Sequence, residues 1–306
     1  MQPLVKGIVE QVSAVFQGKE HQLKLALACL FSQGHLLIED LPGMGKTTLA
    51  ISLARALGLE YSRVQFTSDL LPADILGVSI FHQQSANFEF RPGPIFSQLL
   101  LADEINRTSP KTQSALLEAM EERHVTIDGQ SHPLPKPFFV IATQNPVYQD
   151  GTYPLPESQL DRFLMCINLG YPDAHVERAL LVGDDPRHKL NGIQCSVSPE
   201  DWQTFYSAHS EVLVSDALLD YVQRIIEYTR TSQAFAHGIS TRAALSLMRC
   251  AKTWAWLHGR DHLLPDDIQT LLPSVVGHRV KGHGDRQVQS SSSLITQALN
   301  DVDVLA

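Results

Sequence analysis

Gly43-Met44-Gly45-Lys46-Thr47-Thr48 stands between a short apolar segment, residues 35–39, and a helical pattern that begins at Lys46. Glycines let a loop turn its backbone N–H groups toward a phosphate, and the helix that follows directs partial positive charge to the same place. We expect Lys46 to reach the β- and γ-phosphates of a nucleotide and the Thr47 hydroxyl to ligate Mg²⁺. The predicted nucleotide contacts are Pro42, Gly43, Met44, Gly45, Lys46, Thr47 and Thr48.

One position departs from the full loop pattern GxxxxGK[ST], which begins with glycine where this chain has Asp40. A carboxylate at this position must point away from the phosphates, because otherwise it would repel them. The competing interpretation is a glycine-containing turn followed by a chance Lys-Thr pair. The phosphate-loop prediction therefore depends on support from other parts of the chain.

Leu99-Leu100-Leu101-Ala102-Asp103-Glu104 is an apolar run that ends in two consecutive carboxylates. In open α/β sheets, ligands bind at the C-terminal ends of the strands. We expect Asp103 to hold Mg²⁺, directly or through water, and Glu104 to orient and polarise the attacking water as a general base. A strand ending in a solvated acidic turn is the alternative, and the glycine loop upstream argues against it.

Two further polar residues are candidates for the same site. Asn145 follows the apolar segment 138–143, where its amide could hydrogen-bond the attacking water or the γ-phosphate, although an Asn-Pro pair is also a turn former. Arg162 follows Asp161, and an arginine can stabilise charge on a transferring phosphoryl group from a neighbouring subunit. From the residues alone, an ordinary Asp-Arg surface pair is the better interpretation of Arg162.

Short apolar strands alternate with helices in the first half of the chain, which predicts an α/β fold with a parallel sheet covered by helices on both faces. The expected strands are 35–39, 61–66, 98–102, 138–143 and 166–169. The expected helices of this part are 1–16, 22–31, 46–56 and 111–122. Residues 70–77 are turn-rich, and two small hairpins are expected at 79–90 and from 124 to 128 and its turn.

After Pro172 the expected elements are all helices. They are 173–182, 199–207, 216–232, 241–259, 265–271 and a final amphipathic helix at 294–305, joined through the serine run 290–293. We therefore predict an αβα nucleotide-binding domain at 1–171, a linker at 172–198, and a small all-helical lid with a C-terminal tail at 199–306.

Composition limits the partners. The net charge is −9 and the chain has no dense Lys/Arg tract, so nucleic acid is an unlikely ligand. The longest apolar runs are far shorter than the roughly 20 residues of a membrane span, and the start lacks the basic and apolar regions of a secretory signal. The expectation is a cytoplasmic protein without a membrane span.

Longer stretches resemble the AAA+ ATPases, and within them the MoxR-type branch. The matching stretches are Glu39-Asp40-Leu41-Pro42-Gly43-Met44-Gly45-Lys46-Thr47, Arg91-Pro92-Gly93-Pro94-Ile95, Ala102-Asp103-Glu104-Ile105-Asn106-Arg107, Leu116-Leu117-Glu118-Ala119-Met120-Glu121-Glu122, Ala142-Thr143-Gln144-Asn145-Pro146, Leu155-Pro156-Glu157-Ser158-Gln159-Leu160-Asp161-Arg162-Phe163, Gly238-Ile239-Ser240-Thr241-Arg242-Ala243 and His278-Arg279. The resemblance covers about residues 9–280.

The resemblance implies roles for particular residues. This branch often has a residue other than glycine at the position of Asp40. Asn145 becomes a sensor-1 candidate, and Arg242 becomes a sensor-2 candidate from the helical lid. Arg162 becomes the first candidate for the arginine finger, with Arg107 as a second candidate for a contact between subunits.

The resemblance also implies an ATPase that uses ATP/ADP and Mg²⁺ in a homo-oligomer, a hexameric ring with sites between subunits. The two hairpins would face the pore of the ring. Similar proteins are chaperone-like remodellers of protein substrates, often with a von Willebrand factor A domain partner, and they help to mature metal-cofactor enzymes or complexes. Two alternatives stay open: a nucleic-acid motor or loader on the same fold, and a nucleotide-dependent scaffold without turnover. The presence of Glu104 argues against the second.

Overall fold

The computed structural model describes residues 2–83, 86–145, 152–183, 185–195, 197–283 and 291–304. Its centre is a five-stranded parallel sheet in the order β2-β5-β8-β1-β9. The strands are β1 Leu36–Glu39, β2 Tyr61–Gln65, β5 Leu99–Asp103, β8 Phe139–Gln144 and β9 Met165–Ile167. This arrangement confirms the predicted parallel α/β fold.

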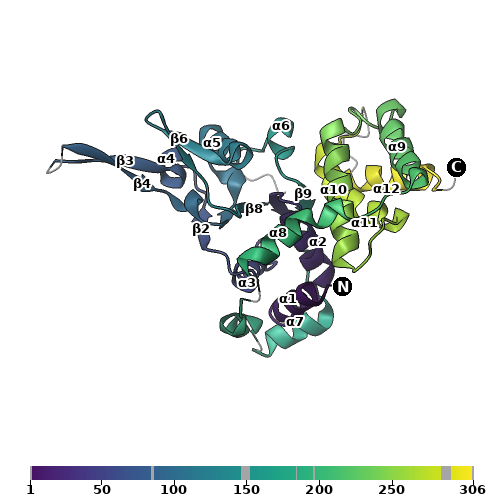
Figure 1. The fold of residues 1–306 in the computed structure, drawn as a ribbon, viewed down its shortest axis with the longest axis horizontal. Coiled ribbons are helices and arrows are strands. Elements are labelled where there is room, and N and C mark those ends of the chain that lie inside the picture. Colours follow the sequence, from purple (N-terminus) through teal and green to yellow (C-terminus); the bar gives the residue numbers. More distant parts are fainter. Residues whose placement is uncertain are drawn as a thin grey trace.

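The helices lie around this sheet and beyond its β9 edge (Figure 1). The α-helices are α1 Pro3–Ser13, α2 Glu20–Phe31, α3 Lys46–Ala56, α4 Pro72–Leu76, α5 Pro110–Glu122, α6 Glu157–Leu160, α7 Ala174–Leu181, α8 Pro199–Ser207, α9 Asp216–Thr231, α10 Thr241–Leu257, α11 Pro265–Val276 and α12 Ser291–Asp301. The short 3₁₀ helices are η1 Pro94–Phe96, η2 Ile105–Arg107, η3 Pro186–Gly192, η4 Ala208–Ser210 and η5 Gly277–Arg279.

Each face of the sheet packs into its own core, because successive side chains of a strand point to opposite faces. On β5, Leu99 and Leu101 belong to the larger core, which includes α1, α2, α3 and the C-terminal helices. Leu100 and Ala102 point to the other face and pack with the apolar side of α5. Both faces are thus buried, as expected for a parallel sheet.

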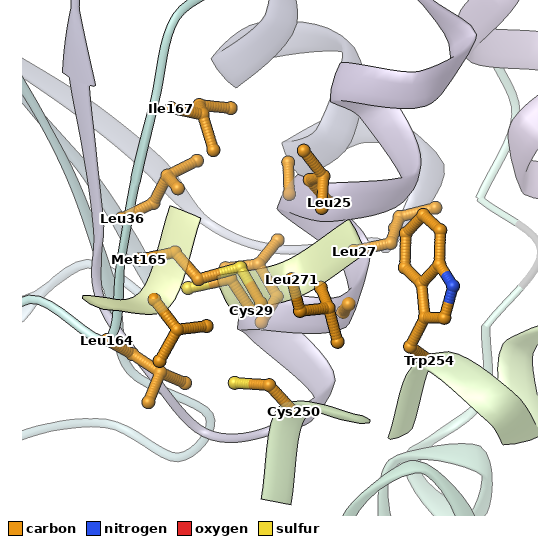
Figure 2. Close-up of a cluster of buried hydrophobic side chains, with 14 of the residues drawn as sticks. Leu25, Leu27, Cys29, Leu36, Leu164, Met165, Ile167, Cys250, Trp254 and Leu271 are labelled. Atoms are coloured by element: carbon orange, nitrogen blue, oxygen red, sulfur yellow. The ribbon is translucent and has the colours of Figure 1, made fainter. Parts of the chain in front are cut away.

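The larger core joins the sheet to the C-terminal helices. Figure 2 shows side chains from α2, β1, β9, α10 and α11 in one buried cluster, which includes Cys29, Cys250 and Trp254. In the same core, Phe31 of α2 stacks on Phe205 of α8, with ring centroids 4.1 Å apart. The helical C-terminal part is therefore packed directly on the helix layer of the sheet.

Two antiparallel hairpins extend the domain. The first is β3 Gly77–His82 with β4 Asn87–Pro92, and it projects far from the body of the molecule (Figure 1). The second is β6 His124–Ile127 with β7 Gln130–Pro133. Both lie where hairpins were expected, although residues 84–85, in the tip of the first, fall outside the described residues.

Three local expectations were wrong. The turn-rich stretch 70–77 contains the helix α4, and α11 continues past the expected end at Leu271 to Val276. The last helix begins at Ser291 within the expected serine link and ends at Asp301, whereas residues 305–306 are not described. In the part of the chain that the structure describes, no helix has the length and apolar character needed to cross a bilayer.

Candidate active site

A cavity of about 670 Å³ opens at the C-terminal ends of the strands. It is lined by the whole predicted phosphate loop, residues 42–48, and by Asp103, Glu104 and Asn145. These residues come from three separate stretches of the sequence, and the parallel sheet brings them to one edge because their strands all end there. The structure therefore assembles every predicted site residue except Arg162 and Arg242.

The predicted phosphate loop turns at two glycines. Gly43 and Gly45 have φ values of 86° and 91°, in the left-handed region that glycine adopts freely. A Cβ on Gly45 would also approach the Phe16 ring to 3.2 Å. The helix α3 begins directly after Gly45, so its unpaired N–H groups face the cavity side of the loop.

Lys46 is the first residue of α3 and half-buried in the wall of the cavity. Its Nζ donates to the backbone carbonyl of Asp40 and more weakly, at 3.5 Å, to that of Gln144. Burial lowers the pKa of Lys46, and the charges of Asp40, Asp103 and Glu104 oppose this shift. The ammonium is thus held at the ends of β1 and β8, next to the loop.

The contacts of Asp40 explain why a carboxylate is tolerated at this position of the loop. Its Oδ2 accepts the backbone N–H groups of Leu169 and Gly170, the latter at 3.1 Å. Lys19 crosses the same junction, since its Nζ donates to the carbonyls of Met44 at 2.9 Å and Gly170 at 2.7 Å. The carboxylate therefore points away from the phosphate position, and it ties the loop to the segment after β9.

The two acids at the end of β5 are both held by neighbours. Thr143 of β8 donates its hydroxyl to Asp103 Oδ1 at 2.6 Å and accepts the Glu104 N–H at 2.9 Å. Glu104 has a φ of 58°, which is uncommon for a residue with a side chain and is typical of strained functional positions. Thr143 and this turn aim both carboxylates at the cavity.

Sequence reasoning missed two residues of β2 that contact these acids. Arg63 Nη2 lies 2.6 Å from Asp103 Oδ2, and Gln65 Nε2 donates to Glu104 Oε2 at 2.9 Å. Both side chains also line the cavity. From η2, Arg107 Nη1 lies 3.0 Å from the same oxygen of Glu104, so this second finger candidate pairs within its own chain.

Another part of the cavity lining is mainly apolar. It is formed by Val15, Phe16, Pro172, Val176 and Leu180, with the polar rim residues Gln17, Lys19, Asp185 and Arg187. An apolar wall with a few polar groups suits the flat base of a nucleotide. Most of these residues come from the predicted linker 172–198, which therefore contributes α7 and η3 to the cavity wall.

Arg162 and Arg242 lie together in a different place. Arg162 pairs with Glu121 at 3.1 Å, and Arg242 approaches Glu121 at 3.7 Å and Asp161 at 3.5 Å. Neither is among the described residues that line the cavity. Figure 1 shows α6, which precedes Arg162, well separated from α3.

Arg279 of η5 fixes the segment that carries Arg162. Its side chain is 8% exposed, and Nε lies 3.0 Å from Asp161 Oδ1. Its Nη2 donates to the carbonyls of Asp161 and Phe163. His278 Nε2 adds a hydrogen bond at 3.0 Å to the Phe163 carbonyl, so two residues of the C-terminal part hold this segment in place.

Comparison with known proteins agrees with this architecture. Residues 35–165 match the ATPase family associated with various cellular activities (AAA), and residues 227–298 match the AAA lid domain. The uncharacterized protein YeaC of Bacillus subtilis is 43% identical over 99% of this chain and 96% of its own length. The chaperone MoxR1 of Mycobacterium tuberculosis is 40% identical over 88% of this chain and 74% of its own length.

The chain belongs to the MoxR-type AAA+ ATPases. A crystal structure from Cytophaga hutchinsonii, described as that of a candidate ATPase, superposes with a TM-score of 0.88 at 37% identity. The superposition covers 98% of this chain and 94% of the Cytophaga hutchinsonii chain. The sheet followed by a helical lid is thus the AAA+ fold that the resemblance predicted.

The oxygen donors in the cavity fit Mg²⁺. Mg²⁺ at nucleotide sites is held by one or two protein oxygens together with phosphates and water, and this MoxR-type chain offers the Thr47 hydroxyl and the Asp103 carboxylate. Among the described residues, no group of three or more His, Cys, Asp or Glu side chains forms a metal cage. Thr47 and Asp103 therefore offer oxygens that suit an ion also bound by a phosphate.

Proposed function

We propose that this chain binds ATP with Mg²⁺ and hydrolyses it to ADP and phosphate, and that it uses this cycle to remodel a partner protein. The observation that carries the proposal is the cavity that joins Lys46, Thr47, Asp103, Glu104 and Asn145. These side chains supply a cation for the phosphates, oxygens for a metal, a base for water and an amide to orient it.

Each residue has a distinct part in the proposed reaction. Lys46 and the N–H groups at the start of α3 would bind the β- and γ-phosphates, while Thr47 and Asp103 would hold the metal. The bound metal would neutralise charge that develops on the phosphate oxygens. Glu104 would orient the attacking water and take its proton, and Asn145 would hydrogen-bond the water or the γ-phosphate.

The positions of Arg162 and Arg242 favour a site completed by a second copy of the chain. Hydrolysis of this kind gains from an arginine near the transferring phosphoryl group, and neither arginine lines the cavity of its own chain. We therefore propose a homo-oligomer, a hexameric ring, in which Arg162 acts on the neighbour's nucleotide as the finger and Arg242 assists from the lid.

The exposed hairpin β3–β4 supports the remodelling role. Phe81 and Phe88 pair across its two strands with ring centroids 5.1 Å apart, although they are 50% and 67% exposed. Exposed apolar groups of this kind mark interaction sites. We propose that they contact the protein substrate, and that a von Willebrand factor A domain protein selects it, for example a metalloenzyme complex. The name of the relative MoxR1, a chaperone, is consistent with this role.

The decisive experiment replaces the general base. We expect Glu104→Gln to bind ATP with near-native affinity and to lower kcat by about 10² or more, since general-base catalysis contributes about 10²–10⁴. Phosphate release is measured on an assembled, Mg²⁺-supplied sample. Glu122→Gln, an exposed site at the end of α5, is the matched control. Turnover at the native rate by Glu104→Gln would refute the assignment.

A further inference from the structure

Arg63 occupies one of the two oxygens that the proposed metal ligand Asp103 offers. Its Nη2 lies 2.6 Å from Asp103 Oδ2, and the Thr143 hydroxyl takes Oδ1 at 2.6 Å. On the paired strands, Gln65 of β2 stands opposite Asp103 of β5, and Arg63 lies two residues earlier on the same face. Both oxygens of the carboxylate thus have partners within the chain.

We propose that Arg63 is a positioning residue that serves as the counter-ion of Asp103 and has to leave it before the carboxylate can ligate a metal. This inference rests on the proposed nucleotide function. A lone carboxylate beside a polyphosphate would repel it, and the guanidinium removes that repulsion until a divalent ion takes over. Arg63 and the metal therefore compete for one carboxylate.

The exposure of the pair makes this exchange easy. The Arg63 side chain is 46% exposed and that of Asp103 is 14% exposed, so the guanidinium can return to water without crossing the core. A pair with one end open to solvent loses less on separation than a fully buried pair does. Arg63 can therefore give way to a doubly charged ion, whereas a buried pair would resist the exchange.

Arg63 also reaches Glu104 through Gln65. Arg63 Nη2 donates to Gln65 Oε1 at 3.2 Å, and Gln65 Nε2 donates to Glu104 Oε2 at 2.9 Å. When Arg63 leaves Asp103, Gln65 loses the donor that fixes the orientation of its amide. Metal binding at Asp103 is thereby linked to the hydrogen bond that holds the Glu104 carboxylate.

The test measures nucleotide binding rather than turnover. The dissociation constant of ADP is determined by titration calorimetry in EDTA and again in saturating Mg²⁺. The value in EDTA divided by the value in Mg²⁺ is then compared between variants. Arg63→Gln removes the competing charge, so we expect the ratio to rise about 2- to 5-fold, in line with the strength of an exposed ion pair. The concentration of Mg²⁺ that gives half of its effect should fall by a similar factor.

Three further variants make the result specific. Arg63→Lys keeps a positive charge and should stay near the native ratio. In an Asp103→Asn background, Arg63→Gln should change the ratio little, because the shared carboxylate is gone. Arg55→Gln removes an exposed arginine of α3 that contacts Asn191 instead, and it should leave the ratio unchanged.

The outcomes separate this inference from the function on which it rests. If native protein binds ADP more tightly with Mg²⁺ but Arg63→Gln shows the native ratio, the counter-ion role is wrong and the nucleotide site stands. An equal effect of Arg63→Gln with and without Asp103 would also overturn it. If native protein shows no Mg²⁺ effect on ADP binding, both proposals fail.

Discussion

Asp40→Gly would restore the glycine with which the full phosphate-loop pattern begins, and we expect it to destabilise the protein. The Asp40 carboxylate accepts the N–H groups of Leu169 and Gly170. It also offsets the effect of burial on Lys19, whose pKa burial lowers and the charge of Asp40 raises. Glycine at this position would remove all three interactions at once.

The expected loss can be estimated from these contacts. Hydrogen bonds to charged groups contribute about 1.5–3 kcal/mol, and only part of this is lost here, because the exposed N–H of Gly170 can turn to water. The added backbone freedom of glycine costs about 0.5–1 kcal/mol. Together these give a decrease of about 2–4 kcal/mol in the free energy of unfolding for Asp40→Gly.

Equilibrium urea unfolding without nucleotide measures this change. Asp40→Asn keeps an acceptor without the charge and should lose about half as much. Asp128→Gly is the control, since Asp128 has a φ of 52° in the turn between β6 and β7, where glycine is favoured. The reasoning is refuted if Asp40→Gly is as stable as the native chain, or binds ADP more tightly.

Two further predictions concern the arginine pair and a buried histidine. Mixing Glu104→Gln with Arg162→Ala should give at least several-fold more ATPase activity than either variant alone. In mixed assemblies, a copy with an intact Glu104 can lie next to a copy with an intact Arg162, which completes a site. No recovery in co-assembled samples would place Arg162 outside the neighbour's site. His35 is buried, with Nε2 donating to the Met120 carbonyl and Nδ1 accepting the Val140 N–H, and burial lowers its pKa to about 4 from 6.5. The unfolded chain then binds the extra proton as pH falls from about 6.5 to about 4, so stability should fall by about 2 kcal/mol at pH 5 relative to pH 8. His35→Gln should remove that part of the slope in urea unfolding, and an unchanged slope would contradict the buried neutral form.

The sequence located most elements because their signals are local. The helix α3 has the expected bounds, and α5 and α9 differ from theirs by one residue. The helix α11 was expected to end at Leu271, but it runs through Pro273, although proline interrupts the helical hydrogen-bond pattern. It continues because Val275 and Val276 are fully buried, and their packing outweighs the lost bond.

Site residues that belong to a local sequence motif were predicted, and those that reach the site only through strand pairing were missed. Lys46, Asp103 and Glu104 lie in recognisable sequence motifs. Arg63 and Gln65 do not, because only the pairing of β2 with β5 brings them to the acids. The role of Lys19 was not predicted for a similar reason, because its carbonyl partners are 25 and 151 residues away in the sequence.

The separation of Arg162 and Arg242 from the cavity has a consequence for assembly. If each cavity needs Arg162 and Arg242 of the next copy, an open row of copies always ends in one cavity that lacks this pair and one pair that has no cavity to act on. Only closure of the row removes both defects. Closure would then complete the last site, so hydrolysis per copy would be highest in the closed ring, and the proposed ATP site itself would report whether the ring is complete.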